Sequence, residues 1–110
     1  MDNHLDNFFS ALSDPTRRAV IERLAQGPAA VTELFAPHDI ALPSFLKHIN
    51  KLEAAGLVRT IKTGRTRMVH IEAAPLELAE GWLKQQRRIW EGRTDRLAAL
   101  AEALERRSGA

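Results

Sequence analysis

The chain has 110 residues, 45% of them hydrophobic and 27% charged, which is the composition of one globular domain with a modest core. It contains no cysteine, and this excludes disulfides, thiolate metal sites and thiol redox chemistry. No apolar run approaches the roughly 20 residues that a membrane-spanning helix needs. The first residues have no signal-peptide pattern, so we expect a cytoplasmic protein with no membrane partner.

The net charge of +2 is unevenly distributed along the chain. Residues 1–40 carry a net charge of −3, whereas residues 41–72 carry +4. A local positive field of this kind is typical of proteins that bind a polyanion such as nucleic acid. A solvated basic surface gives the same pattern, so charge alone does not decide between the two.

The first predicted helix is short. Its apolar residues recur at helical spacing and form one face: Leu5, Phe8, Phe9 and Leu12. Asp14 and Pro15 then predict the N-cap and the first residue of a second helix, which stops at Gly27. A third, very short helix is predicted from Thr32 as its N-cap to the residues before Pro37.

A fourth helix is predicted from Pro43 to about Ala55. Its buried stripe is Phe45, Ile49 and Leu52, and its other side is largely polar. Gly56 follows, where a helix end favours a left-handed residue.

The segment Arg59–Ile71 predicts a β-hairpin with its bend at Gly64. Its tip is basic, with Lys62, Arg65 and Arg67. Since an isolated hairpin is marginally stable in water, we expect it to pack on the preceding helix and to use its tip as an electrostatic contact.

Residues 75–107 predict a long helix in which Gly81 and Gly92 permit a break. A leucine or tryptophan recurs every seven residues along it: Leu76, Leu83, Trp90, Leu97 and Leu104. An exposed stripe of this kind promotes aggregation of a monomer, so we expect a second copy of the chain to cover it.

This order of elements predicts a mainly α fold with one β-hairpin, a winged helix-turn-helix followed by a long dimerisation helix. We expect one domain over residues 1–110, with a DNA-binding core at 1–74 and the dimerisation helix at 75–107. The recognition helix, about 43–55, fits the major groove, and the basic wing at 61–68 fits the flanking DNA. The expected DNA contacts are Ser44, Lys47, His48, Lys51, Lys62, Arg65 and Arg67.

Three motifs show a family resemblance: Leu12–Arg17, the Lys47-His48 pair with Leu52–Val58, and Gly64-Arg65 at the wing. Over about residues 5–72 the chain resembles the ArsR-type winged-helix repressors, and its end resembles members without a thiolate metal site. The resemblance implies a homodimeric repressor, built from the first and last helices, that binds near-palindromic double-stranded DNA. The expected dimer residues are Leu5, Phe8, Phe9, Trp82, Leu83, Trp90 and Leu97.

Two positions depart from the family pattern, in which many members have serine. Ala41 has no capping oxygen for the recognition helix. Leu46 lacks a hydroxyl for DNA, although it could meet a thymine methyl group or pack with Leu42.

Two other functions fit the same scaffold: a protein-interaction module without DNA binding, and a sensor of metal or small molecules. The histidines show no ligand spacing, and no catalytic motif is present, so we expect no metal, no cofactor and no enzymatic activity. Some individual roles also stay open. His48 suits DNA contact or a structural hydrogen bond, and Arg17 or Arg18 suits phosphate contact or pairing with Glu22 or Glu33.

Overall fold

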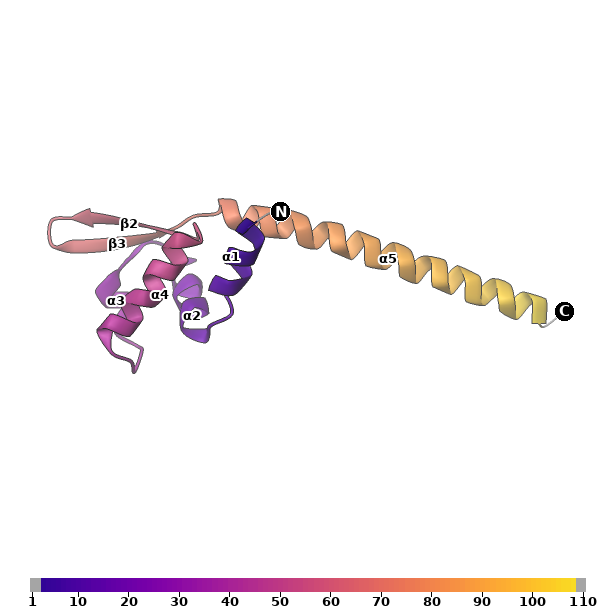
Figure 1. Ribbon diagram of the computed structural model, residues 1–110, viewed down its shortest axis with the longest axis horizontal. Helices are drawn as coiled ribbons and strands as arrows, with labels where there is room; N and C mark the ends of the chain where they lie inside the picture. The colour runs from indigo at the N-terminus through magenta and orange to yellow at the C-terminus, as the bar shows by residue number, and fades with distance from the viewer. Residues whose placement is uncertain (1–2, 109–110) are drawn as a thin grey trace. The chain divides into compact units, whose positions relative to one another are not determined.

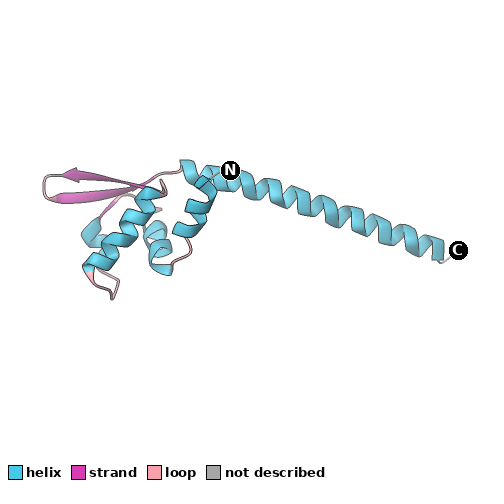
Figure 2. Ribbon diagram, in the orientation of Figure 1, coloured by secondary structure: helices cyan, strands magenta, loops and turns pink. Residues whose placement is uncertain are grey.

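The computed structural model describes residues 3–108, which form two compact units, one ending at Ala79 and one beginning at Glu80 (Figure 1). Most of the described chain is helical (Figure 2). The helices are α1 (Asn3–Ala11), α2 (Pro15–Leu24), α3 (Val31–Phe35), α4 (Leu42–Ala54) and α5 (Ala74–Ser108), and the strands are β1 (Ala29–Ala30), β2 (Val58–Thr63) and β3 (Thr66–Ile71). The predicted mainly α, winged helix-turn-helix fold is confirmed.

The strands form an antiparallel sheet in the order β1-β3-β2, so the hairpin does not stand alone. Ala29 and Ala30 of β1 pair with Val69 and Met68 of β3. The prediction of a lone hairpin was incomplete because two adjacent alanines carry no alternating pattern. Strand β1 holds the base of the hairpin to the helices, whereas the turn of the hairpin extends away from them (Figure 1).

The core of the first unit lies between the helices and one face of the hairpin. Its most deeply buried large side chains are Val20, Leu24, Phe45, Ile49, Leu52 and Val69. The predicted buried stripe of the recognition helix is therefore confirmed. Phe8 and Ala11 of α1, and Ala79 near the start of α5, complete the same cluster.

The start of α2 is capped as predicted, because the carboxylate of Asp14 accepts a hydrogen bond from the backbone N–H of Arg17 at 3.1 Å. The predicted N-cap of α3, Thr32, is wrong. That helix begins at Val31, because Ala30 ends strand β1 in an extended conformation and so fixes where the helix begins. Its cap residue provides no side-chain hydrogen bond.

The end of α4 fixes the direction of the chain into the wing. Gly56 has a φ of +75°, and its N–H bonds the carbonyl of Glu53 at 2.9 Å. The N–H of Leu57 bonds the carbonyl of Leu52 at 3.0 Å, and both leucines are buried. This pair of bonds is a Schellman motif, which confirms the predicted role of the glycine.

The long helix α5 is unbroken at Gly81 and Gly92. In the second unit, the described residues from Glu80 to Ser108 form one helix, and much of its apolar surface is exposed. Leu83, Trp90, Leu97 and Leu104 are each 50–66% exposed. Within residues 3–108, no helix is long and apolar enough to span a membrane.

Candidate nucleic-acid interface

One side of α4 faces solvent with polar residues. Ser44, Lys47 and Lys51 are all exposed, as their positions opposite the buried stripe require. Asn50, which was not among the predicted contacts, lies on the same exposed side, one turn from Lys47. Its position three residues after Lys47, a predicted contact, is the sequence feature that could have identified it. A side-chain amide can bond both N6 and N7 of adenine.

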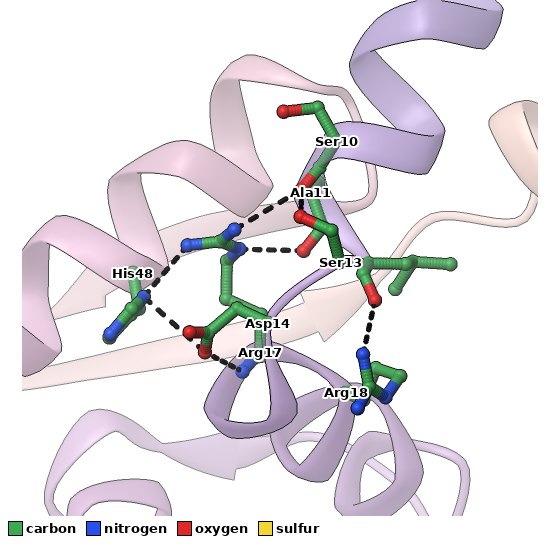
Figure 3. Close-up of polar contacts among 8 residues, drawn as sticks. Ser10, Ala11, Ser13, Asp14, Arg17, Arg18 and His48 are labelled. Atoms are coloured by element: carbon green, nitrogen blue, oxygen red, sulfur yellow. Dashed lines mark hydrogen bonds and ion pairs between the residues drawn. The ribbon is translucent and has the colours of Figure 1, made fainter.

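His48 has a different environment from these residues, because its side chain is only 23% exposed. Its Nδ1 lies 2.9 Å from Nη1 of Arg17 and 3.8 Å from Oδ2 of Asp14 (Figure 3). The structural hydrogen bond that the sequence left open is therefore present at one ring nitrogen. It attaches the flank of α4 to the start of α2.

Arg17 is buried, with 8% of its surface exposed, and it joins three elements. Its Nε donates to the carbonyl of Ala11 at 2.6 Å, and its Nη2 donates to the carbonyl of Ser10 at 3.1 Å (Figure 3). These carbonyls end α1, where the helix itself supplies no partners. The pairing of Arg17 with Glu22 or Glu33 is wrong, because its guanidinium bonds these carbonyls and His48 instead. Its contact with phosphate stays a prediction.

The neighbouring arginines have other partners. Arg18 donates to the carbonyl of Leu12 at 2.8 Å, so it also holds the chain that follows α1. Glu33 pairs with Arg23 instead, at 3.6 Å between Nη2 and Oε2.

Asp14 is the acid of this cluster. Partial burial by itself raises the pKa of its carboxyl group, but hydrogen bonds from the backbone N–H groups of Arg17 and Thr16, together with the positive charge of Arg17, lower the pKa below its usual value. The side chain is therefore held as the carboxylate that caps α2.

The wing ends in a two-residue loop, Gly64 and Arg65, between the paired residues Thr63 and Thr66. Gly64 has a φ of +62° and Arg65 does not have a positive φ, as in a type II′ turn. Arg65 is exposed at the tip. Lys62 and Arg67 are direct cross-strand partners, so they share one face, and like charges in that position destabilise a hairpin.

The wing is joined to α4 by a hydrogen-bond network that was not predicted from the sequence. Oε2 of Glu53 accepts from the backbone N–H of Thr60 at 3.1 Å and from its hydroxyl at 2.6 Å. Nη2 of Arg67 donates to the same hydroxyl oxygen at 3.3 Å. Two of the predicted surfaces, the recognition helix and the wing, are thereby held together in one unit.

The cations of these surfaces lack acidic partners. In residues 3–108, no carboxylate lies within the 4.0 Å ion-pair distance of these five predicted contacts: Lys47, Lys51, Lys62, Arg65 and Arg67. At the base of the hairpin the situation differs, because Arg59 pairs with Glu72 at 2.8 Å. The positive charge is thus left uncompensated on α4 and towards the tip of the wing.

The expected dimer residues divide into two groups. Phe8 is 5% exposed and packs in the core of its own chain, whereas the adjacent Phe9 is 41% exposed and forms a T-shaped contact with the Phe8 ring. Leu5 is partly buried against the core. The others are exposed along α5: Trp82, Leu83, Trp90 and Leu97.

No group of three or more metal-ligating side chains occurs in the described part of the chain.

The fold defines the class of protein. A short helix is followed by an exposed helix and an antiparallel wing, and the exposed helix and the wing both carry unneutralised cations. This arrangement is a winged helix-turn-helix of the DNA-binding class.

Comparison with known proteins gives the same class. A family model described as a helix-turn-helix domain matches residues 12–61. The crystal structure of an ArsR family transcriptional regulator, RHA00566, is 53% identical with a TM-score of 0.78, over 81% of this chain and 92% of that one. An ArsR-like transcriptional regulator from Rhodococcus sp. RHA1 is 30% identical with a TM-score of 0.72, over 88% and 89% of the two chains.

Two curated relatives are regulators as well. The HTH-type transcriptional regulator Rv2034 of Mycobacterium tuberculosis is 38% identical, over 64% of this chain and 66% of that protein. The transcriptional repressor SdpR of Bacillus subtilis is 27% identical, over 72% and 88%. The chain belongs to the ArsR family of transcriptional regulators, and it is a DNA-binding transcriptional regulator.

Proposed function

We propose that the protein is a dimeric repressor that binds a near-palindromic operator, with α4 in the major groove and the wing on the flanking DNA. The observation that carries this proposal is the set of unpaired cations on α4 and the wing, two surfaces that Glu53 and Thr60 hold together. An uncompensated cluster on a rigid support fits the phosphate backbone of DNA. The name of SdpR, a repressor, supports repression as the outcome.

The exposed face of α4 suits the reading of bases. Ser44, Lys47 and Asn50 offer hydrogen-bonding groups for base edges in the groove. Leu42 is 45% exposed at the start of the helix, so it offers an apolar contact for a thymine methyl group. Leu46 packs against the core, which leaves less of it for DNA.

Towards the tip of the wing, the cations suit phosphates instead of bases. Lys62, Arg65 and Arg67 are long side chains on a hairpin, and a phosphate near them would offset the repulsion between the cross-strand pair. Lys51, one turn after Lys47, extends the same charge along α4. We expect these residues to contribute affinity that depends little on sequence and strongly on salt.

The exposed apolar residues suit a homodimer. Leu83, Trp90 and Leu97 on α5, and Phe9 on α1, are large side chains that water contacts in a single chain. A second copy would bury them, and a twofold axis would place two recognition helices about 34 Å apart, one turn of DNA.

A selection from random-sequence duplexes with the purified protein tests this function. The proposal predicts enrichment of a palindrome whose half-sites are centred about one helical turn apart. A matched control compares the double variant Lys47→Ala/Lys51→Ala, which should lose binding, with Lys84→Ala/Arg88→Ala on α5, which should keep it. Failure of a folded, dimeric protein to enrich any sequence would contradict the proposal and favour the protein-interaction module.

A further inference from the structure

The contact between Arg17 and His48 fixes where the imidazole carries its proton. Nη1 of Arg17 lies 2.9 Å from Nδ1 of His48. A guanidinium has only N–H donors and no acceptor. In this bond Nδ1 must therefore accept, so the proton of the neutral ring lies on Nε2.

We propose that Arg17 is a positioning residue for DNA recognition: it holds His48 in the Nε2–H tautomer, so that the ring presents a donor from the flank of α4 to an acceptor on DNA. The acceptor chemistry is a phosphate oxygen or N7 of a purine, since both accept one N–H. The DNA half of this proposal rests on the proposed function, whereas the tautomer does not.

The guanidinium is well suited to this role because its other two nitrogens are also hydrogen-bonded. Nε bonds the carbonyl of Ala11, and Nη2 bonds that of Ser10. With 8% of its surface exposed, Arg17 is shielded from solvent. A buried group held by two carbonyls keeps one orientation, and so it presents the same N–H to the imidazole continuously.

The surroundings of the ring agree with this assignment. Asp14 is the other charged group near Nδ1, at 3.8 Å, and its carboxylate already accepts the backbone N–H of Arg17 (Figure 3). The closer partner of Nδ1 is thus a donor, and the acid lies beyond ordinary hydrogen-bond distance. Without Arg17 the ring would be free to exchange tautomers, and it would present an acceptor to DNA part of the time.

Nitrogen NMR of the intact protein tests the tautomer without DNA. In 15N-labelled protein at about pH 8, where an ordinary imidazole is neutral, long-range proton–nitrogen correlations distinguish the protonated from the bare ring nitrogen. The His48 signals are identified by their loss in His48→Asn. We expect Nε2 to carry the proton. A proton on Nδ1, or an equal mixture of the two forms, would overturn the proposal.

Two substitutions of His48 test the donor, with the duplex enriched by the selection as the probe. The amide nitrogen of His48→Gln reaches the position of Nε2, so this variant should bind within about threefold of the native protein. The amide of His48→Asn reaches only the position of Nδ1, so binding should weaken about tenfold. Equal affinities of the two variants would overturn the role.

Arg17→Met tests the positioning residue, and Arg18→Met is its matched control because Arg18 bonds the nearby Leu12 carbonyl without contacting His48. Arg17→Met should release both the tautomer and the orientation of the ring and weaken binding at least about twofold, and in the His48→Asn background it should weaken binding no further. Additive losses would overturn the coupling. If Arg17→Met does not fold, the spectrum of the native protein still tests the tautomer, and the two His48 variants still test the donor. An Nε2–H ring in a protein that binds no duplex would remove the proposed function alone.

Discussion

Two like charges face each other near the end of the wing. Lys62 and Arg67 are cross-strand partners, and Arg67 reaches back to the hydroxyl of Thr60. Such a pair costs stability in the free protein. The arrangement suits a ligand that neutralises both charges. The pair of charges in the wing therefore indicates a binding function.

Arg65→Ala should weaken binding to all duplexes by a similar factor, because a cation on phosphate carries no sequence information. It should also reduce the slope of log affinity against log salt by about one unit. Binding titrations at several salt concentrations give this slope. Arg59→Ala is the control, since Arg59 is already paired with Glu72 and should leave the slope nearly unchanged. An unchanged slope for Arg65→Ala would show that the tip of the wing does not contact phosphate.

Asp14 links helix capping to pH. Its pKa is lowered in the folded protein, so its contribution to stability is present above the ordinary carboxyl pKa of about 3.9 and is lost as the pH falls through the lower folded value. Asp14→Ala should cost about 1 kcal/mol at neutral pH. Urea unfolding of both proteins between about pH 7 and pH 3 should show the difference shrinking on acidification. A difference that stays constant with pH would contradict the role of the carboxylate.

For individual residues, the sequence predicted the roles of side chains whose partners are near in the chain. It did not predict those whose partners come close only in the folded protein. Asp14 caps the helix that follows it because the capping pattern is local. Arg17 and Glu53 act on partners from other elements, six to thirty-one residues away, and no periodicity signals such pairs. The exposed position of Asn50 was predictable from helical spacing, because it lies three residues after Lys47.

Among the elements, the wing depends on its anchor to α4. Thr60→Val removes the hydroxyl that bonds Glu53 and Arg67, without changing the charge or the β-branched shape. We expect the hairpin to lose about 1 kcal/mol of stability, because hydrogen bonds to charged groups contribute at least that much. Amide hydrogen exchange in β2 should accelerate accordingly. Thr63→Val, beside the turn, is the control, and equal exchange in both variants would refute the anchor.

The glycines of α5 predict a simple gain in stability. A Cβ at Gly81 or Gly92 meets nothing within 4 Å in the chain, and each glycine lowers helix propensity by about 1 kcal/mol relative to alanine. Helical spacing places both roughly opposite Trp90. Gly81→Ala/Gly92→Ala should therefore raise the melting temperature and leave the dimer constant unchanged. A weakened dimer would mean that a partner helix packs on the glycine side.

The order of helices and the hairpin followed from spacing, caps and turn residues, since each of these acts within a few positions along the chain. The Schellman end of α4 at Gly56 is an example. Strand β1 escaped prediction because pairing with β3 defines it, and two alanines have no pattern of their own. The start of α3 was misplaced for the same reason.

For the whole molecule, the exposed helix of the second unit is the reason to expect a dimer. Trp90 is 62% exposed there. If it is an interface anchor, Trp90→Ala should weaken the dimer by a few kcal/mol. Sedimentation across a range of concentrations measures this, with Lys84→Ala as the control, since Lys84 pairs with Glu80 within the same helix. A mutant that stays fully dimeric at low micromolar concentration would contradict the anchor.

In the proposed complex, two copies of this chain present their α4 helices to one duplex. Footprinting of the selected duplex, combined with the mass of the complex in solution, tests it most directly. We expect two chains per duplex and two protected half-sites centred about 34 Å apart. A single chain per duplex, or no protection even in dilute salt, would contradict it.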